Sequence, residues 1–180
     1  MLRLLLISFL SFFIAACHQS HDSHEAQHEL KFEVMEQKSD FTEGLEWHQD
    51  LPHFSQGYFP SADPDSDLKE ASQLALAENK KILMVVGGDW CSWCHVMTRF
   101  FTDNKPVREL LLSKFHLLKV NMSEDNENQQ FLSNYPEIEG YPHIFVLSAA
   151  GELLSSVSAA TLENGRTYSE SKFTELISQY

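Results

Sequence analysis

A continuous apolar run, Ile82-Leu83-Met84-Val85-Val86, constrains the fold of this 180-residue chain most strongly. Five consecutive apolar residues followed by two glycines are typical of a strand that is buried on both faces. A helical apolar pattern over 68–79 precedes the run, with Asp67 predicted as its N-cap and Glu70 as the N3 partner. The core of the protein is therefore expected to be a sheet covered by helices.

Further helices and strands alternate after this run. The patterns predict helical segments over 91–101, from Pro106 to 114 and from the loop 123–128 to about 135, strands over 115–122, 144–147 and 153–157, and a last helix to about 178 behind a Thr167/Glu170 capping box. Strands separated by helices pair in parallel, whereas a closing hairpin adds antiparallel strands. We expect one α/β domain over 63–180, with a central mixed β-sheet flanked by helices.

The first seventeen residues have the organisation of a secretory signal. Arg3 is followed by an apolar core from Leu4 to Ile14 and by two alanines suited to cleavage. Ile14-Ala15-Ala16-Cys17 resembles a bacterial lipobox, so we expect removal of residues 1–16, secretion across the inner membrane and a lipid anchor at Cys17. An ordinary signal peptide is the alternative. By the same resemblance, His18 in place of Asp favours the outer membrane, with the domain in the periplasm.

Charge and composition exclude several classes of protein. With 13 basic and 26 acidic residues the net charge is −13, which disfavours nucleic acid as a partner. The apolar stretch at the N-terminus is shorter than the roughly 20 residues of a spanning helix, which excludes a multi-span membrane protein. A hydrophobic content of 43% is that of a globular domain.

Two segments connect the lipid site to the domain. Residues 17–30 are polar and contain four histidines, His18, His21, His24 and His28. We interpret this segment as a tether, with a histidine metal site as the alternative. Residues 31–62 are rich in aromatic residues and are expected to pack on the domain. Their sequence leaves open whether they cover a face or line a groove.

With Cys17 assigned to lipid, Cys91 and Cys94 are the remaining cysteines. They follow the buried strand at the start of a helix, where backbone N–H groups and the helix dipole stabilise a thiolate. Cys91 is therefore expected to be an exposed nucleophile with a lowered pKa, and Cys94 the shielded resolving thiol. A disulfide across so small a loop contributes little to stability, so the pair is better explained by chemistry.

Trp90-Cys91-Ser92-Trp93-Cys94-His95, together with Gly140-Tyr141-Pro142 before a strand, resembles the thioredoxin-like superfamily over residues 63–180. The resemblance implies a thioredoxin-like fold, a cis Pro142 that faces the cysteines, and backbone groups of Tyr141 that bind an extended substrate. Within the superfamily, the stretch from Asp67 to Met97 looks most like periplasmic or secreted members with W-C-x-W-C-H motifs.

One position departs from the thioredoxin pattern. Thioredoxin has a buried acidic residue six positions before the first cysteine, where it accepts a proton from the resolving thiol, whereas this chain has Val85. Asp89, His95 or solvent are the candidates for that role, and His95 is included as a modulator of the site. The dipeptide Ser92-Trp93 does not define whether the pair reduces or oxidises its substrates.

Three alternatives remain for the cysteine pair. Cys91-x-x-Cys94-His95 also matches the c-type haem attachment motif. The two thiols could instead bind or deliver a soft metal such as copper. A non-catalytic scaffold that presents Trp90, Trp93 and Tyr141 to a partner is the third.

The interpretation we favour is a thiol:disulfide oxidoreductase of the bacterial cell envelope. Cys91 and Cys94 would exchange disulfides, and Trp90, Trp93, Tyr141 and Pro142 would bind the substrate. We expect no cofactor and no metal. Protein thiols and disulfides are the expected partners, with a membrane electron donor as a candidate upstream of them.

Overall fold

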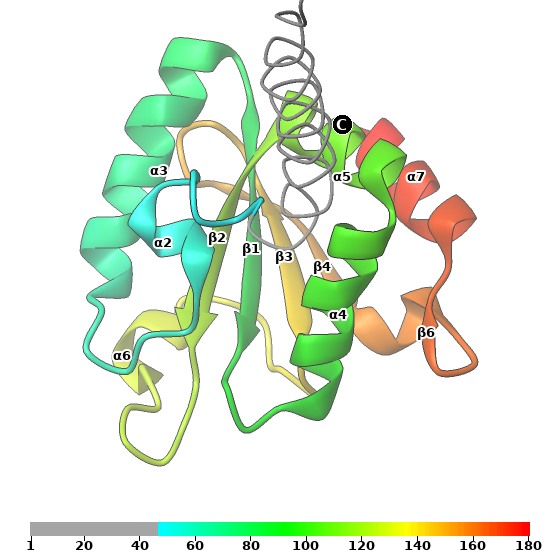
Figure 1. Ribbon diagram of the computed structural model, residues 1–180. Coiled ribbons are helices and arrows are strands. Elements are labelled where there is room, and N and C mark those ends of the chain that lie inside the picture. The colour runs from blue at the N-terminus through cyan, green and yellow to red at the C-terminus, as the bar shows by residue number, and fades with distance from the viewer. Residues whose placement is uncertain (1–46) are drawn as a thin grey trace, which may run out of the picture. The chain divides into compact units, whose positions relative to one another are not determined.

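The computed structural model describes residues 47–180, which form an α/β domain around a four-stranded sheet (Figure 1). The strands are β1 (Lys81–Gly87), β2 (Phe115–Asn121), β3 (His143–Leu147) and β4 (Leu153–Ser158), in the order β2-β1-β3-β4. β1 pairs in parallel with β2 and antiparallel with β3, and β3 pairs antiparallel with β4. The expected mixed sheet is confirmed.

β1 is buried on both faces, as its apolar run predicts. Ile82, Met84 and Val86 belong to the apolar cluster on one side of the sheet, whereas Leu83 and Val85 belong to the cluster on the other side. All five side chains are at most 2% exposed. Because successive strand residues point to opposite faces, a strand in this position has no solvent face.

Helices cover both faces of the sheet (Figure 1). The helix α3 (Pro64–Glu78) packs on the Ile82 side. The helices α4 (Ser92–Asp103), α5 (Lys105–Lys114) and α7 (Glu170–Ser178) pack on the Val85 side, where their buried residues include Phe100, Leu111 and Phe173.

Residues 47–62 pack against the domain. The short helix α2 (His53–Gln56) lies on the edge strand β2, with Phe54 2% exposed and the Ser55 hydroxyl donating to the carbonyl of Leu117. The indole Nε1 of Trp47 donates to Thr102 Oγ1 of α4 at 3.1 Å. Tyr58, also in this segment, enters the same apolar cluster as α4. The segment therefore covers an edge of the sheet and reaches the layer below the cysteine pair.

Three helix boundaries differ from the sequence prediction. α3 begins one turn early: its N-cap is Asp63, whose carboxylate accepts from the Asp65 N–H, so the prediction of an Asp67 cap is wrong. Proline is favoured in the first turn of a helix, and Pro64 supplies this start. The helix expected to reach about residue 135 is shorter, because α6 spans only Gln129–Leu132.

The start of the last helix also differs. Thr167 lies in β6 (Thr167–Tyr168), which pairs with β5 (Glu163–Asn164) after the 3-10 helix η1 (Ala159–Leu162). The N-cap of α7 is Ser169, whose hydroxyl accepts from the Lys172 N–H. The predicted Thr167/Glu170 capping box is therefore wrong, because the chain turns through a small hairpin before it becomes helical.

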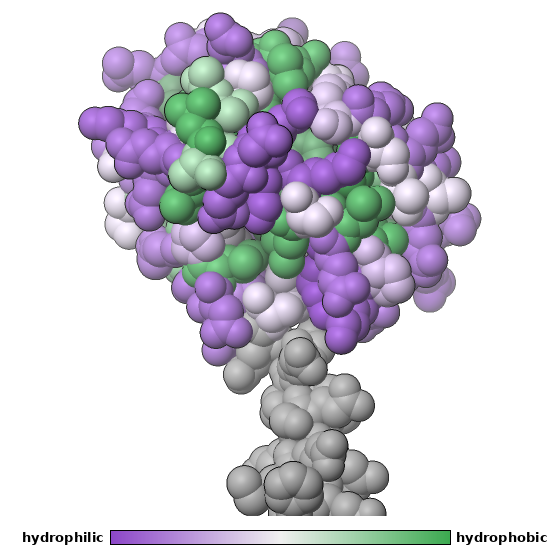
Figure 2. Space-filling view, turned by 90° about the horizontal axis from the view of Figure 1, so that it is seen from above, coloured by the Kyte–Doolittle hydropathy of each residue, from purple (hydrophilic) through white to green (hydrophobic). Residues whose placement is uncertain are grey.

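The face of the molecule in Figure 2 is largely hydrophilic, with apolar residues in small separate patches. Within residues 47–180, no helix is both long enough and apolar enough to span a bilayer. The predicted signal peptide, the lipid site at Cys17, the tether 17–30 and the first part of the extension 31–62 lie outside the described residues.

Candidate active site

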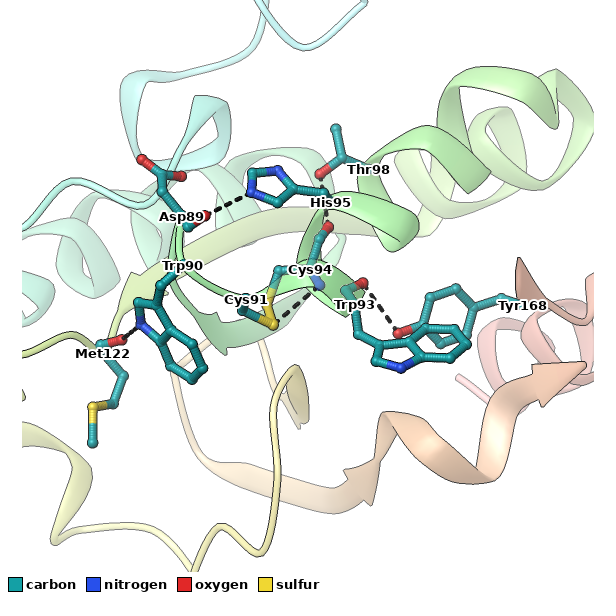
Figure 3. The surroundings of a disulfide bond; sticks show 9 residues. All are labelled: Asp89, Trp90, Cys91, Trp93, Cys94, His95, Thr98, Met122 and Tyr168. Carbon is teal, nitrogen blue, oxygen red and sulfur yellow. Dashed lines mark hydrogen bonds between the residues drawn. A yellow bond between two sulfur atoms is a disulfide. The ribbon is translucent and has the colours of Figure 1, made fainter. Parts of the chain in front are cut away.

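Cys91 and Cys94 form a disulfide at the junction of β1 and α4 (Figure 3). Cys91 is the N-cap of α4, and its Sγ accepts a hydrogen bond of 3.1 Å from the backbone N–H of Cys94. Their Cα atoms are 5.2 Å apart. An N-cap position points a sulfur at free backbone N–H groups, which is the electrostatic setting that stabilises a thiolate.

The structure corrects the expected exposure of Cys91. Cys91 is 4% exposed and Cys94 2% exposed, so both residues are buried in the disulfide form. As the N-cap, Cys91 turns its sulfur back over the first turn of α4 toward the Cys94 N–H and away from solvent.

Trp90 forms an exposed aromatic surface directly before the disulfide (Figure 3). It is 59% exposed, its Nε1 donates to the Met122 carbonyl at 2.6 Å, and its ring makes an edge contact with Tyr141 at 5.5 Å. A Cβ at Gly88 would lie 2.5 Å from Trp90 Nε1 and 2.8 Å from the Met122 carbonyl oxygen, so glycine permits this crossing. Trp90, Met122 and Tyr141 line a groove of about 590 Å³ together with Glu124, Asp125 and Glu127.

Trp93 has a different environment from Trp90. Its ring is partly buried against the core and makes an edge contact with Tyr168 at 5.4 Å. The Tyr168 hydroxyl donates to the Trp93 carbonyl at 3.4 Å. Trp93 thus joins α4 to β6, whereas the groove beside the disulfide is lined by Trp90.

The peptide bond between Tyr141 and Pro142 is cis, as the resemblance implies. The antiparallel register pairs Val86 with His143, so Pro142 lies beside the end of β1 that leads to the cysteines. Tyr141 and Pro142 are therefore brought to the disulfide from a distant part of the sequence.

His95 lies at the surface on the first turn of α4. Its Nε2 is 2.7 Å from the backbone carbonyl of Asp89, a contact visible in Figure 3. The hydrogen bond connects α4 to the loop before the cysteines, which is compatible with a modulating role through the position of that loop.

The layer below Cys94 contains two polar residues that the sequence analysis missed, Tyr58 and Lys119. Both line a small cavity together with Val85 and Cys94. The Nζ of Lys119 donates to the Gln56 carbonyl at 3.2 Å and lies 5.5 Å from the centre of the Tyr58 ring. Burial lowers the pKa of Lys119 to about 8, and burial also raises the pKa of Tyr58 above its usual value.

The sequence contains a signal that identifies Lys119 as an inward-facing residue. It follows Leu117 by two residues in β2, so the strand period places it on the same face as that core residue. A lysine at an inward-facing strand position is unusual. No comparable local signal exists for Tyr58, because it lies in irregular chain and meets β2 only through the tertiary fold.

Among residues 47–180 there is no group of three or more His, Cys, Asp or Glu side chains arranged to hold a metal ion. The tether histidines lie outside these residues.

Comparison with known proteins agrees with the observed fold. A family model described as thioredoxin-like matches residues 63–149. The solved disulphide isomerase from Xylella fastidiosa Temecula1 superposes with a TM-score of 0.58 at 22% identity, covering 72% of this chain and 96% of that one. The oxidised C-terminal domain of DsbD from Neisseria meningitidis gives 0.48 at 24% identity, with 66% and 96% covered.

A sequence relative is an uncharacterized protein of Caenorhabditis elegans, 30% identical over 83 residues. The match covers 46% of this chain but spans only 10% of that relative. The fold of the described residues is therefore thioredoxin-like, and it carries a Cys-x-x-Cys disulfide.

Proposed function

We propose that this protein is a thiol:disulfide oxidoreductase that exchanges disulfides with protein substrates through Cys91 and Cys94. The observation that carries the proposal is the Cys91/Cys94 disulfide at the N-terminus of α4, adjacent to the exposed Trp90. The X. fastidiosa neighbour is named a disulphide isomerase, which is compatible with this chemistry.

The exchange has two steps when the protein acts as a reductant. The Cys91 thiolate attacks one sulfur of a substrate disulfide and forms a mixed disulfide, while the other substrate sulfur leaves as a thiolate. Cys94 then loses its proton and attacks Cys91 Sγ, which releases the second substrate thiolate. Two electrons pass from the cysteine pair to the substrate, and the same steps run in reverse for oxidation.

The groove beside the disulfide would bind the substrate. Trp90 and Tyr141 provide apolar contact area, and the backbone at Tyr141 and Pro142 would pair with an extended segment. Aromatic side chains that are exposed yet held by a hydrogen bond lose little conformational entropy on binding. This groove would bring the substrate sulfur to Cys91.

We also propose that the protein is located in the bacterial cell envelope. The signal segment and Cys17 favour secretion across the inner membrane and a lipid anchor, with the outer membrane preferred and the domain in the periplasm. Such a compartment contains protein disulfides as substrates. A membrane electron donor would be needed if the pair acts as a reductant there.

The decisive experiment measures the reduction potential of the Cys91/Cys94 couple by equilibration in glutathione and dithiothreitol buffers. A value near roughly −270 mV would assign a reductant, and one near roughly −120 mV a disulfide donor. Absence of a reversible two-electron couple would refute the proposed oxidoreductase function. Cys91→Ser is the matched control that removes the couple.

A trapping experiment tests the order of attack. Cys94→Ser should accumulate a mixed disulfide on Cys91, because the resolving thiol is missing. Cys91→Ser should accumulate none. Mixed disulfides trapped equally by both variants would contradict the assigned roles.

A further inference from the structure

Tyr58, which is buried, and Lys119, which is partly buried, line a small cavity together with the resolving cysteine. The cavity that contains Cys94, Lys119 and Tyr58 has a volume of about 10 Å³, about the size needed for one water molecule. Its remaining wall is mostly apolar, and includes Val85, Met97 and Leu117. A proton that leaves Cys94 on this side therefore has few polar groups to go to.

The position of Gly87 shows how close Cys94 and Tyr58 are. A Cβ built on Gly87 would collide with Cys94 Sγ, and the hydroxyl oxygen and Cζ of Tyr58 would lie 3.3 Å from the same point. The Tyr58 phenol and the Cys94 sulfur therefore both lie next to the space that the missing side chain of Gly87 leaves. The Nζ of Lys119 lies 5.5 Å from the centre of the Tyr58 ring, and Lys119 lines the same cavity as Cys94.

Tyr58 is unsuited to accept the proton. Burial, together with the nearby Tyr168 and Asp89, raises the pKa of its hydroxyl, so the group stays protonated at neutral pH. Its ring instead lines the cavity and lies 5.5 Å from the Lys119 amine.

Lys119 has the opposite tendency. Its amine has one carbonyl partner, Gln56, and within residues 47–180 no carboxylate lies within ion-pair distance of it. Burial lowers the pKa of Lys119 to about 8, and the charge of Asp89 only partly opposes this shift. At pH 7 roughly one such amine in ten is neutral, against fewer than roughly one in a thousand for an ordinary lysine. The neutral amine is a base.

We propose that Lys119 accepts the proton of Cys94 during resolution of the mixed disulfide. Val85 occupies the position at which thioredoxin has a buried acidic residue, so this chain needs another proton acceptor. The proposal rests on the oxidoreductase function given above. In this step the Cys94 S–H proton passes to the Lys119 amine, directly or through one water in the cavity. The Cys94 sulfur forms a bond to Cys91 Sγ, and the bond from Cys91 to the substrate sulfur breaks. The substrate leaves as a thiolate, and the Lys119 ammonium later returns its proton to solvent.

The titratable groups around this step come from three parts of the chain. Tyr58 belongs to the extension, Asp89 to the loop before α4, and Cys94 to α4 itself. Since Lys119 and Cys94 would share one proton, their titrations are coupled and the observed pKa belongs to the pair.

The test uses the reduced full chain and the aromatic disulfide DTNB, which releases a coloured thiolate at each step. The first release reports attack by Cys91, and the second reports resolution by Cys94. Lys119→Met and Lys119→Gln should slow the second release at least roughly tenfold at neutral pH and leave the first release nearly unchanged. The pH profile of the second release should move upward by about one unit or more, because the buried Cys94 thiol would then ionise without its partner.

The controls separate this proposal from the function on which it rests. Lys105→Met removes an exposed lysine and the same charge, and should leave both releases unchanged. If both Lys119 variants fold and keep the wild-type pH profile of the second release, the role of Lys119 is overturned. The proposed oxidoreductase function is not affected by that result. If the wild-type chain shows no second release and forms no disulfide, the oxidoreductase itself fails.

Discussion

The indole Nε1 of Trp90 donates a 2.6 Å hydrogen bond to the backbone carbonyl of Met122, across the turn that carries the cysteines. This bond holds an aromatic ring that is 59% exposed beside the disulfide. The ring edge also contacts Tyr141 at 5.5 Å, so Trp90 connects the loop before Cys91 with the cis peptide. A fixed, solvent-facing aromatic surface is suited to contact a protein substrate.

Replacing each tryptophan should separate binding from stability. Trp90→Ala should lower kcat/KM for a protein disulfide by roughly tenfold and change the free energy of unfolding by less than about 1 kcal/mol, because the ring is exposed. Trp93→Ala should cost about 2–4 kcal/mol of stability, because its ring packs on Tyr168 and the core. Urea unfolding and steady-state kinetics measure both. Equal loss of stability in the two variants would contradict the assignment.

Gly87→Ala should destabilise the domain by about 1–3 kcal/mol through overpacking. The added Cβ would collide with Cys94 Sγ and meet the Tyr58 ring. Gly140→Ala is the matched control, since a Cβ there meets nothing within 4 Å and Gly140 is not among the positive-φ glycines. Thermal unfolding of the two variants checks the difference, and a Gly87→Ala variant as stable as wild type would contradict the tight packing below Cys94.

His143 should make the domain less stable in acid. Burial lowers the pKa of its imidazole, and its Nε2 is 2.9 Å from Ser156 Oγ. A histidine with a folded pKa below its unfolded value near 6.5 stabilises the fold above pH 6.5, and the contribution is lost as the pH falls through the folded pKa.

His143→Gln removes this titration. Between about pH 7.5 and about pH 5 the free energy of unfolding of the wild type should fall more than that of the variant, by about 1.4 kcal/mol for each unit of pKa difference. Urea titrations at several pH values measure the difference between the proteins, which cancels the other histidines. Parallel curves would show that His143 does not contribute.

Cys17→Ser should abolish lipid attachment if residues 14–17 act as a lipobox. Wild-type protein expressed in a bacterium that processes lipoproteins should incorporate labelled palmitate and fractionate with membranes, and the variant should do neither. Ser20→Ala is the control for a nearby change. Unlabelled wild-type protein that begins at residue 17 would instead support an ordinary signal peptide.

Local sequence patterns were sufficient to predict most of the helices and strands. The run Ile82 to Val86 is a strand buried on both faces because its composition allows no solvent face. Cys91 and Cys94 lie at a strand-to-helix junction for equally local reasons. The starts of α3 and α7 were displaced, since Asp63 with Pro64 and Ser169 offered better caps than Asp67 and Thr167.

The sequence by itself determined the mixed α/β sheet, the close cysteine pair and its place at the start of α4, because these depend on neighbouring residues. Only the tertiary structure decided that Trp90 is exposed while Trp93 packs inward, that Cys91 is buried, and that Lys119 lies below Cys94. It also placed Tyr58 in that cavity. These relationships join segments far apart in the chain, and their distances are set by how the sheet, α4 and the extension pack together, which no local period encodes.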